Sequence, residues 1–596
     1  MTVQAHRPPS ITCRRVIFGL LVLFSLAVMA SLMAFVLAPG GFNGVKLALL
    51  TCFLITLPWL VVGFWHAVIG FGIMVFARDP AGLTCPIDPA GASQGIPERA
   101  TALLSCIRNE NVQEVERKLD AMVSGLVTRS VEEGFALYVL SDTSDDRIAE
   151  EEAEIFEAMR QRWHGRISVV YRRRTVNTGY KAGNIADFCA RWGHLHRYAI
   201  TLDADSYLAP ETLVALVQRM EANPQVGILQ TLAVGLPSKA LFARVFQWGM
   251  RLGMRSYTLA AAWWQGDCGP YWGHNAILRL EPFRTQCMLD PLPGRGPLAG
   301  AILSHDQIEA VLMRRAGFEV RVWPVEDGSY EENPPNLIEY VRRDLRWCHG
   351  NLQYVKLLTL KGLKLVSRIQ LLMAILMYVS SIAWMAFIAI TVYASLAAPP
   401  ETLQFDSGLG MVMFAVVMTM VFAPKASSLC YVMMSTNRRK GFGGGARVAI
   451  SAICEVVFTM LLAPLMAITH TLFVIMLFAG ARVGWQRQER LPKGVGWAMA
   501  MRKFWPQFGL GCLGIWWASQ FPLAMQWLFL PIVTGPALVL PLTVFSSMPS
   551  LGAIADRYGF WRLPEEREKP AEFRLLENGG LAAEDLQQSG PAVLPR

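Results

Sequence analysis

Long apolar runs constrain the fold of this chain more than any other feature of its sequence. Residues 16–38 and 47–76 are almost wholly hydrophobic, and each run is longer than the roughly 20 residues with which a helix crosses the hydrocarbon core of a bilayer. Further runs of this kind lie at residues 367–397 and 409–434. With 53% hydrophobic residues, the chain is too apolar for an ordinary water-soluble protein. The sequence therefore predicts a membrane protein with a soluble part.

Basic residues beside the apolar runs predict the orientation of the chain. Arg14 and Arg15 precede the first run, so the positive-inside rule places the N-terminus in the cytoplasm, and a second crossing returns the chain there. The first run is too long for the apolar core of a signal peptide and has no convincing cleavage site, so we expect it to be retained. The loop at residues 398–408 has no Lys or Arg, and we expect it outside.

The apolar run at residues 448–481 has basic residues on both flanks. The loop before it, residues 435–447, carries four of them and is expected inside. A single crossing would place the other basic flank outside, against the positive-inside rule. We therefore expect a helical hairpin that is broken near Pro464 or His470.

The rest of the chain predicts an interfacial segment, two more spans and a tail. Residues 484–507 combine three Trp with five Lys or Arg, a composition typical of a segment at the membrane surface. Two final spans are expected within 508–548, and the polar tail is expected to be disordered at its end. The total is about eight spans, with both termini in the cytoplasm. The expected domains are an N-terminal helix pair, a cytoplasmic domain, a C-terminal membrane region and a cytoplasmic tail, at residues 1–76, 77–365, 366–548 and 549–596.

Composition argues against nucleic-acid binding and against a cysteine-based site. The net charge is +9, but the basic residues lie beside apolar segments, where they orient the chain and attract anionic lipid. We therefore expect the lipid bilayer as a partner and no nucleic acid. None of the 11 cysteines forms a C-x-x-C pair, so neither a zinc site nor a disulfide framework is indicated.

Residues 77–365 alternate short apolar segments with helical patterns. This alternation is typical of a mostly parallel, doubly wound α/β sheet. About 290 residues are ample for one such domain with an insertion. The expected strands are 101–105, 135–140, 167–171, 198–202 and 226–229.

Two aspartates, Asp203 and Asp205, follow the expected strand 198–202. They would lie at the carboxyl edge of the sheet, where open α/β sheets bind their ligands. Residues 208–224, which come next, have apolar side chains at helical spacing. Carboxylates one residue apart between a strand and a helix can hold a hard divalent cation, which would in turn hold a diphosphate. The alternative is an ordinary turn, because turns are rich in Asp.

Two further segments are candidates for binding a nucleotide. Asp142 follows an expected strand, and its carboxylate could accept a hydrogen bond from a base or a ribose; an Asx turn is the alternative. The basic segment 171–184 contains Arg172, Arg173 and Lys181, which would attract a diphosphate. A solvated basic loop is the alternative explanation of that segment.

Asp306 is the candidate general base. It precedes a helical pattern at residues 308–312, where an Asp most often serves as the N-cap. Its carboxylate could instead remove the proton from an acceptor hydroxyl on the sugar face opposite a leaving phosphate, like the base of an inverting glycosidase. The neighbouring His305 competes for this role.

The segment R-R-D-L-R-W at residues 342–347 combines cations with an aromatic ring. Arg343 and Arg346 could neutralise a leaving diphosphate, and Trp347 offers a flat ring to a sugar face. His274, in the segment W-G-H-N, could contact the acceptor. Basic and aromatic residues just before a membrane span also serve as interfacial anchors, so that explanation stays open.

Together these residues resemble the processive family 2 glycosyltransferases, the group that contains cellulose and hyaluronan synthases. In that group an aspartate after an early strand, a D-x-D, a later catalytic aspartate and a Q-x-x-R-W sequence recur in this order beside membrane helices. Arg343 departs from the pattern, because it stands where the motif has Gln. The order is matched by Asp142, Asp203 with Asp205, Asp306 and residues 343–347.

The resemblance implies a GT-A-like, doubly wound mixed α/β domain inserted between transmembrane helices. It implies an inverting glycosyltransferase that uses a divalent metal ion, Mg²⁺ or Mn²⁺. The roles expected of the candidate residues are catalysis for Asp306, donor binding for Asp142, Lys181, Asp203, Arg343 and Arg346, acceptor binding for Trp347 and His274, and metal binding for Asp203 and Asp205.

Longer segments resemble the membrane glucosyltransferases that make osmoregulated periplasmic glucans in Gram-negative bacteria. The segments are Y-R-R-R-x-x-N-x-x-x-K-A-G-N-I-A-D-F, L-D-A-D-S, W-G-H-N, L-S-H-D and R-W-C-H-G-N-L-Q. This resemblance implies UDP-glucose as the donor, a growing β-1,2-linked glucan as acceptor and product, and the bacterial inner membrane as the location. It also implies acyl carrier protein as a candidate partner.

Two other functions stay compatible with the sequence. One is a nonprocessive transferase that acts on a lipid-linked acceptor and releases a glycolipid. The other is a transporter whose soluble domain binds a nucleotide, although Lys425, Glu455 and His470 are a thin set of intramembrane charges for ion coupling. Membrane spans beside a cytoplasmic site favour a growing chain that leaves through the bilayer.

Overall fold

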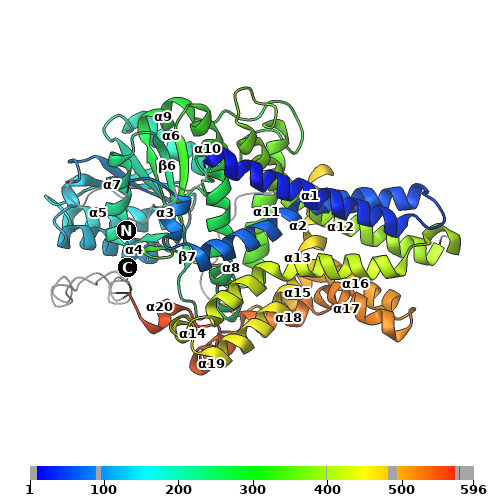
Figure 1. Cartoon of the computed structure of the whole chain (residues 1–596). Coiled ribbons are helices and arrows are strands. Elements are labelled where there is room, and N and C mark those ends of the chain that lie inside the picture. The colour runs from blue at the N-terminus through cyan, green and yellow to red at the C-terminus, as the bar shows by residue number, and fades with distance from the viewer. Residues whose placement is uncertain are drawn as a thin grey trace.

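The computed structural model describes residues 10–88, 95–397, 399–480, 493–570, 573 and 576. An α/β domain lies at one end of a group of long helices (Figure 1). Four of these helices extend away from the domain together, so the chain enters the domain from one helix pair and leaves it into another. They are α1 (Ile11–Leu37), α2 (Gly44–Phe76), α12 (Leu365–Ala397) and α13 (Ser407–Met433).

A mixed sheet forms the centre of the domain. Its described strands lie in the order β3-β2-β1-β4-β8-β6-β9. β8 runs antiparallel to β4 and β6, and the other neighbours are parallel. The expected strands are confirmed as β1 to β4 and β6, while β8 and β9 were not expected. The bounds are β1 (Thr101–Ile107), β2 (Phe135–Ser141), β3 (Ser168–Arg173), β4 (Tyr198–Asp203), β6 (Val226–Thr231), β8 (Ala276–Arg279) and β9 (Glu319–Trp323).

A second, smaller sheet has the order β5-β10-β7. It includes Leu208, which was expected to begin a helix. The structure places Leu208 in β5, and α7 begins at Pro210. The strands of this smaller sheet are β5 (Tyr207–Leu208), β7 (Val234–Gly235) and β10 (Ser329–Glu331).

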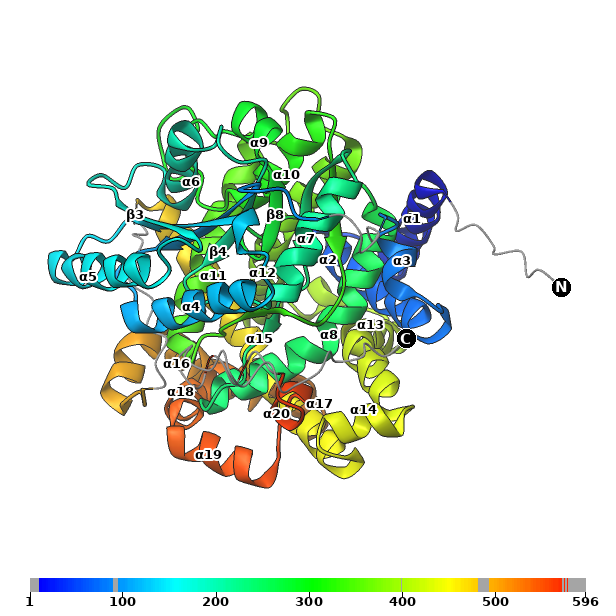
Figure 2. The same cartoon turned by 90° about the vertical axis from the view of Figure 1, so that its left-hand side faces the viewer.

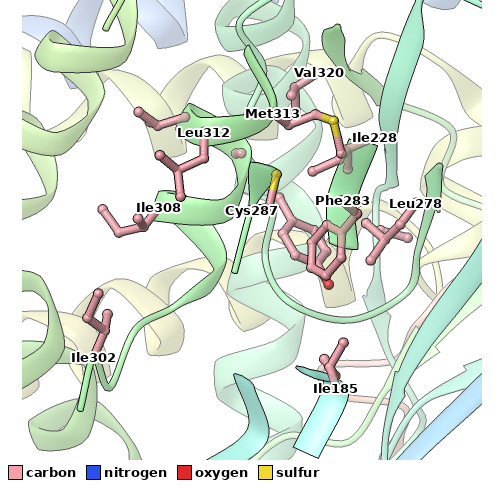
Figure 3. Close-up of a cluster of buried hydrophobic side chains, with 14 of the residues drawn as sticks. Ile185, Ile228, Leu278, Phe283, Cys287, Ile302, Ile308, Leu312, Met313 and Val320 are labelled. Atoms are coloured by element: carbon pink, nitrogen blue, oxygen red, sulfur yellow. The ribbon is translucent and has the colours of Figure 1, made fainter. Parts of the chain in front are cut away.

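Helices cover both faces of the main sheet (Figure 2). Successive residues of a strand point to opposite faces, so Leu103 of β1 joins one hydrophobic core and Leu104 joins the other. In the second core, Ile185 and Phe283 meet Leu278 of β8 (Figure 3). One face carries α4 (Val112–Thr128), α5 (Asp146–Arg162) and α7 (Pro210–Ala222), and the other carries α6 (Tyr180–Arg191), α9 (Leu280–Gln286) and α10 (Asp306–Arg315).

Two helices join the domain to the membrane helices. Helix α8 (Leu241–Gln265) packs against α1 and α2, and its Trp264 stacks on Phe18 of α1 with ring centroids 4.5 Å apart. Helix α11 (Leu337–Gln353) packs against α12 and α15. The remaining helices are α3 (Pro80–Thr84), α14 (Thr436–Gly441), α15 (Gly445–Phe478), α16 (Trp497–Ala518), α17 (Leu523–Ala537), α18 (Val539–Ser547), α19 (Pro549–Tyr558) and α20 (Pro564–Arg567).

Several of the described helices can cross a membrane by their length and composition. Among the described residues, α1, α2, α12, α13 and α15 are long and apolar enough. A pair of short helices, 526–537 and 539–547, is bent by 58° and adds at most a sixth span. Of the expected interfacial segment, residues 484–492 lie outside the described part of the chain, and residues from 497 on begin α16. The described residues thus offer five or six candidate spans, and the count of about eight stays a prediction.

The hairpin expected at residues 448–481 is wrong, because α15 is one continuous helix with Pro464 inside it. Its first turns pack against Trp248 of α8 through Val448. Its last turns join the hydrophobic cluster that contains Cys348 of α11. Both ends thus lie next to helices that join the α/β domain to the membrane helices.

The first part of the expected tail is packed onto α8. The guanidinium of Arg244, only 2% exposed, donates to Glu566 at 2.6 Å and lies 3.3 Å from Asp556. Arg251 donates to Glu565 at 2.7 Å. Residues 577–596 lie outside the described part of the chain.

Replacing Glu566 with Ala should loosen this docking. It leaves the buried Arg244 with the more exposed Asp556 as its carboxylate partner, and breaking a buried ion pair costs about 3–5 kcal/mol. We expect trypsin to cleave residues 549–570 faster than in the wild type, as followed by mass spectrometry of the protein in detergent. Glu568→Ala, which alters an exposed side chain nearby, is the matched control. Equal cleavage rates in both variants would contradict the docking.

Candidate active site

A cavity of about 420 Å³ lies at the carboxyl ends of β1, β2 and β4. Residues from distant parts of the chain meet in its walls, including residues of α6, α10 and α11. All nine candidate site residues line it, namely Asp142, Lys181, Asp203, Asp205, His274, Asp306, Arg343, Arg346 and Trp347.

The D-x-D segment continues directly from β4. The Asp203 backbone N–H donates to the Ser206 hydroxyl at 3.0 Å, and the Ser206 N–H donates to the Asp203 carbonyl at 3.0 Å, so a tight turn fixes both aspartates. The ammonium of Lys181 donates to the Asp203 carboxylate and, at 2.7 Å, to the Gly273 carbonyl. Burial lowers the pKa of Lys181, but Asp203, Cys106 and Asp306 raise it, and the net pKa is above its ordinary value. Lys181 therefore stays a cation beside the D-x-D.

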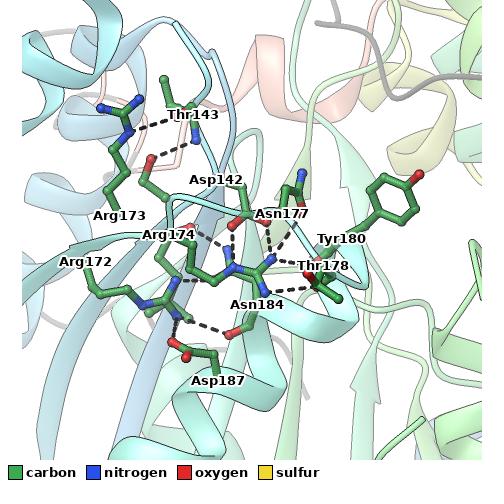
Figure 4. Close-up of polar contacts among 12 residues, drawn as sticks. Asp142, Thr143, Arg172, Arg173, Arg174, Asn177, Thr178, Tyr180, Asn184 and Asp187 are labelled. Atoms are coloured by element: carbon green, nitrogen blue, oxygen red, sulfur yellow. Dashed lines mark hydrogen bonds and ion pairs between the residues drawn. The ribbon is translucent and has the colours of Figure 1, made fainter. Parts of the chain in front are cut away.

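Arg174 holds Asp142 at the cavity (Figure 4). Its guanidinium donates to both carboxylate oxygens of Asp142 at 2.7 Å, a bidentate pair. It also donates to the Thr178 carbonyl at 3.1 Å and to the Tyr180 carbonyl at 3.0 Å. One arginine thus ties the carboxyl end of β2 to the loop that leads into α6.

The same loop is too tightly folded to accept a side chain at Gly183. A Cβ atom there would lie 1.9 Å from the Thr178 carbonyl oxygen. Gly179 has φ +72°, in the left-handed region that favours glycine. These two glycines permit the close packing that places Lys181 in the cavity.

Arg172 and Arg173 do not line the cavity, contrary to the expectation that they attract a diphosphate. Arg172 is buried and donates to Asn184 at 2.6 Å, with an ion pair to Asp187 at 3.0 Å. Arg173 donates to Asp146 at 2.7 Å. Both side chains stabilise the domain, and Lys181 is the cation of this segment that reaches the cavity.

Asp306 is the first residue of α10, and His305 occupies the N-cap position. The explanation of Asp306 as an N-cap is therefore wrong. Its Oδ1 accepts a hydrogen bond from the Gln307 N–H at 3.0 Å. Gly273 lies against it, since a Cβ atom at Gly273 would be 3.3 Å from the Cβ of Asp306. The W-G-H-N loop therefore packs against the start of α10 in the wall of the cavity.

His305 is paired with a buried carboxylate. Its Nδ1 lies 2.9 Å from Oε2 of Glu309, one turn further along α10. Burial lowers the pKa of His305, but the Glu309 and Asp306 carboxylates raise it, so the net pKa is above its ordinary value. A histidine that holds its proton is the poorer base, which favours Asp306 over His305 for accepting a proton.

Further charges and the ring of Trp347 also line the cavity. The guanidinium of Arg343 lies over the ring of Trp347, 4.9 Å from its centroid, and so covers one face of that ring. His274 lies 3.4 Å from the carboxylate of Glu331, which follows Tyr330 in β10. Burial raises the pKa of Glu331. His274 and Arg343 lower this pKa, whereas Asp205 and Asp203 raise it. Glu331 is thus electrostatically coupled to the D-x-D.

Sequence reasoning missed several residues of the site. Arg174 was visible as the last cation of Y-R-R-R, but nothing in the sequence distinguished it from its neighbours. Glu331 stands in a run of acidic residues without a motif. Met254 of α8 and Met377 of α12 also line the cavity, and only the folded chain brings them there.

Two family models match this part of the chain. The model of glycosyl transferase family 2 matches residues 106–286, and the model of glycosyl transferase family group 2 matches residues 198–483. The matches include the D-x-D, Asp306 and the R-R-D-L-R-W segment. This region is a family 2 glycosyltransferase domain. The GT-A-like fold expected from the sequence is thereby confirmed.

The glycosyltransferase domain lies within a longer region of similarity to curated bacterial proteins. The chain is 36% identical over 547 residues to "Glucans biosynthesis glucosyltransferase H" of Pseudomonas paraeruginosa, which covers 89% of this chain and 63% of that protein. It is 36% identical over 561 residues to the protein of the same name from Pectobacterium carotovorum subsp. carotovorum, which covers 90% of this chain and 65% of the relative. The chain thus spans less than two thirds of the length of these relatives.

Among solved structures, the chain is similar to a mannosyltransferase of Pyrobaculum calidifontis in complex with GDP-Man and Mn²⁺. The match covers 63% of this chain and 98% of the other chain at 15% identity, with a TM-score of 0.37.

Replacing Arg174 with Ala should weaken nucleotide binding by the glycosyltransferase domain. The change frees Asp142 and the loop before α6, and a hydrogen bond between charged groups contributes about 1.5–3 kcal/mol. We expect the dissociation constant of UDP, measured by isothermal titration calorimetry, to rise roughly tenfold to a hundredfold. Arg191→Ala, at the exposed end of α6, should leave it unchanged. Wild-type affinity in Arg174→Ala would show that nucleotide binding does not need the Arg174–Asp142 pair.

The His305–Glu309 pair should make stability fall as the pH rises. The folded-state pKa of His305 is raised. The pair therefore contributes fully to the free energy of unfolding below the unfolded pKa of about 6.5, and this contribution is lost as the pH rises through the folded pKa. We expect wild type to melt at a higher temperature than Glu309→Gln at pH 6, by roughly 2–4 °C per kcal/mol, with a smaller difference at pH 9. Glu281→Gln, an exposed carboxylate on α9, should follow wild type at both pH values. A difference that grows with pH would refute this assignment.

Proposed function

We propose that the protein is an inner-membrane, inverting glucosyltransferase that polymerises glucose from UDP-glucose into the β-1,2-linked backbone of an osmoregulated periplasmic glucan. The observation that carries this proposal is the shared cavity, in which Asp306, the D-x-D and the arginines of α11 meet. The similarity to the glucosyltransferases of Pseudomonas and Pectobacterium supports the sugar and the product. The growing glucan is then both acceptor and product.

In the proposed reaction Asp306 is the base. Its carboxylate accepts the proton of an acceptor hydroxyl while the hydroxyl oxygen bonds to the anomeric carbon of the donor glucose. The bond between that carbon and the UDP oxygen breaks, and UDP leaves with the bonding electrons. Attack from the face opposite UDP inverts the configuration. Lys181, Arg343 and Arg346 stabilise the negative charge that develops on the leaving diphosphate.

Asp203 and Asp205 are the residues that would hold a divalent ion. Among the described residues, no group of three His, Cys, Asp or Glu side chains has the arrangement of a metal site. Two carboxylates are nevertheless a suitable set, because Mg²⁺ is commonly bound by one or two carboxylates together with substrate phosphates. When bound, the ion supplies positive charge beside the diphosphate. Lys181 contacts Asp203. When Asp203 binds the ion, the Lys181 ammonium could exchange this contact for one with a phosphate oxygen.

The cavity also reaches the membrane helices. Met254 of α8 and Met377 of α12 line it together with Trp347, whose side chain is part exposed. The acceptor end of the glucan would lie against this wall, and the product would leave between the helices, with the domain and both termini in the cytoplasm. Such a path couples synthesis to export.

Replacing Asp306 with Asn should abolish transfer and leave UDP binding nearly intact. The amide keeps the shape of the carboxylate but cannot accept the proton. We expect transfer of radiolabelled glucose from UDP-glucose in purified membranes to fall by at least about a thousandfold, in the range attributed to general bases. Asp290→Asn, an exposed aspartate, is the control. Wild-type turnover in Asp306→Asn would disprove the assignment.

The same assay separates the proposed function from its rivals. A labelled polymer supports a glucan synthase, a labelled glycolipid supports a nonprocessive transferase, and no labelled product from any UDP-sugar supports a nucleotide-binding transporter. Polymer found only inside sealed inverted vesicles would support export.

A further inference from the structure

A buried polar network lies on the membrane side of α11. The carboxylate of Asp344 lies 2.5 Å from Nε2 of His470 on α15. The hydroxyl of Tyr378 on α12 donates to the Asp344 backbone carbonyl at 3.4 Å and to its Oδ1 at 3.5 Å. Nδ1 of His470 lies 3.1 Å from the Ser381 hydroxyl, also on α12. One aspartate therefore links three helices.

This aspartate stands within the segment that lines the candidate active site. Arg346 and Trp347 follow Arg343 by three and four residues, and all three side chains of α11 border the cavity. Asp344 contacts α12 and α15. Helix α11 thus borders the cavity on one face and contacts α12 and α15 on another. Met377, beside Tyr378 in the sequence, lines the cavity as well.

The network fixes the rotation of α11 about its own axis. Rotation of α11 by about 100°, the turn that one residue makes, would carry the Arg343 and Arg346 side chains away from the cavity. Hydrophobic contacts between helices tolerate such rotation, whereas a hydrogen-bonded carboxylate does not, because an unpaired buried charge is costly. Asp344 and His470 are only 15% and 10% exposed in their side chains.

We propose that Asp344 and His470 are positioning residues, which hold Arg343 and Arg346 toward the nucleotide diphosphate and couple that placement to the packing of α12 and α15. The inference rests on the proposed function only in that the cavity binds a nucleoside diphosphate. A shift of α15 along α12 then changes the affinity of the cavity for the nucleotide.

The test measures the dissociation constant of UDP for the full chain in detergent, by isothermal titration calorimetry. His470→Phe keeps a ring but removes both hydrogen bonds, and we expect the constant to rise about tenfold. His470→Gln retains an N–H that can reach Asp344, and we expect it to recover to within about threefold of wild type. Tyr378→Phe removes one hydroxyl and should weaken binding about twofold to threefold.

The matched control is Glu455→Gln. Glu455 lies on the same helix as His470 but pairs with Lys425 of α13. It should leave UDP affinity unchanged, although it removes an ion pair from the same helix. Wild-type affinity in folded His470→Phe, or an equal loss in Glu455→Gln, would overturn the proposal. If His470→Phe does not fold, Tyr378→Phe decides, and unchanged affinity in that variant overturns the proposal.

The outcome does not depend on the sugar or the product. A wild-type protein that binds UDP but transfers no glucose would refute the proposed glucan synthesis, while the binding constants of the variants would still decide the role of Asp344 and His470. A merely structural role would lower the fraction of protein that binds UDP without changing the dissociation constant of that fraction.

Discussion

The parallel pairing of β2, β1 and β4 is the constraint on which the cavity depends. Parallel strands end at the same edge, so Asp142 after β2 and Asp203 at the end of β4 must lie at that edge. β8 runs antiparallel to β4, with Ala276 paired to Thr201, and therefore begins where the parallel strands end. The loop before β8, with His274, is delivered to the same edge for this reason. One reversed strand thus adds a further wall to the cavity at this edge.

Acids and bases in the cavity are arranged in pairs. Asp142 is held by Arg174, Asp203 by Lys181, and Glu331 lies beside His274 and within reach of the charge of Arg343. Pairing makes several partly buried charges tolerable in a small volume.

The sequence predicted the strands whose apolar runs are long, and the site residues whose chemistry is distinctive. It could not predict β8 or the small sheet, because those strands span only two to four residues and depend on pairing with distant segments. It also could not rank the arginines of Y-R-R-R. Successive strand residues point to opposite faces, so Arg172 and Arg173, which lie within β3, point to the two faces of the sheet. Arg174, just past the end of β3, reaches Asp142 at the edge of the sheet.

The charge rule led to a hairpin at α15, whereas the structure has one continuous helix there. Three polar side chains of this helix show another constraint, since each meets a partner from a different element. Ser451 accepts from the backbone N–H of Trp561, Glu455 meets Lys425, and His470 meets Asp344. In an apolar setting such contacts define the position of a helix better than hydrophobic area does. His470, which the sequence offered as a point of breakage, is therefore one of the contacts that keep α15 continuous and in place beside α11.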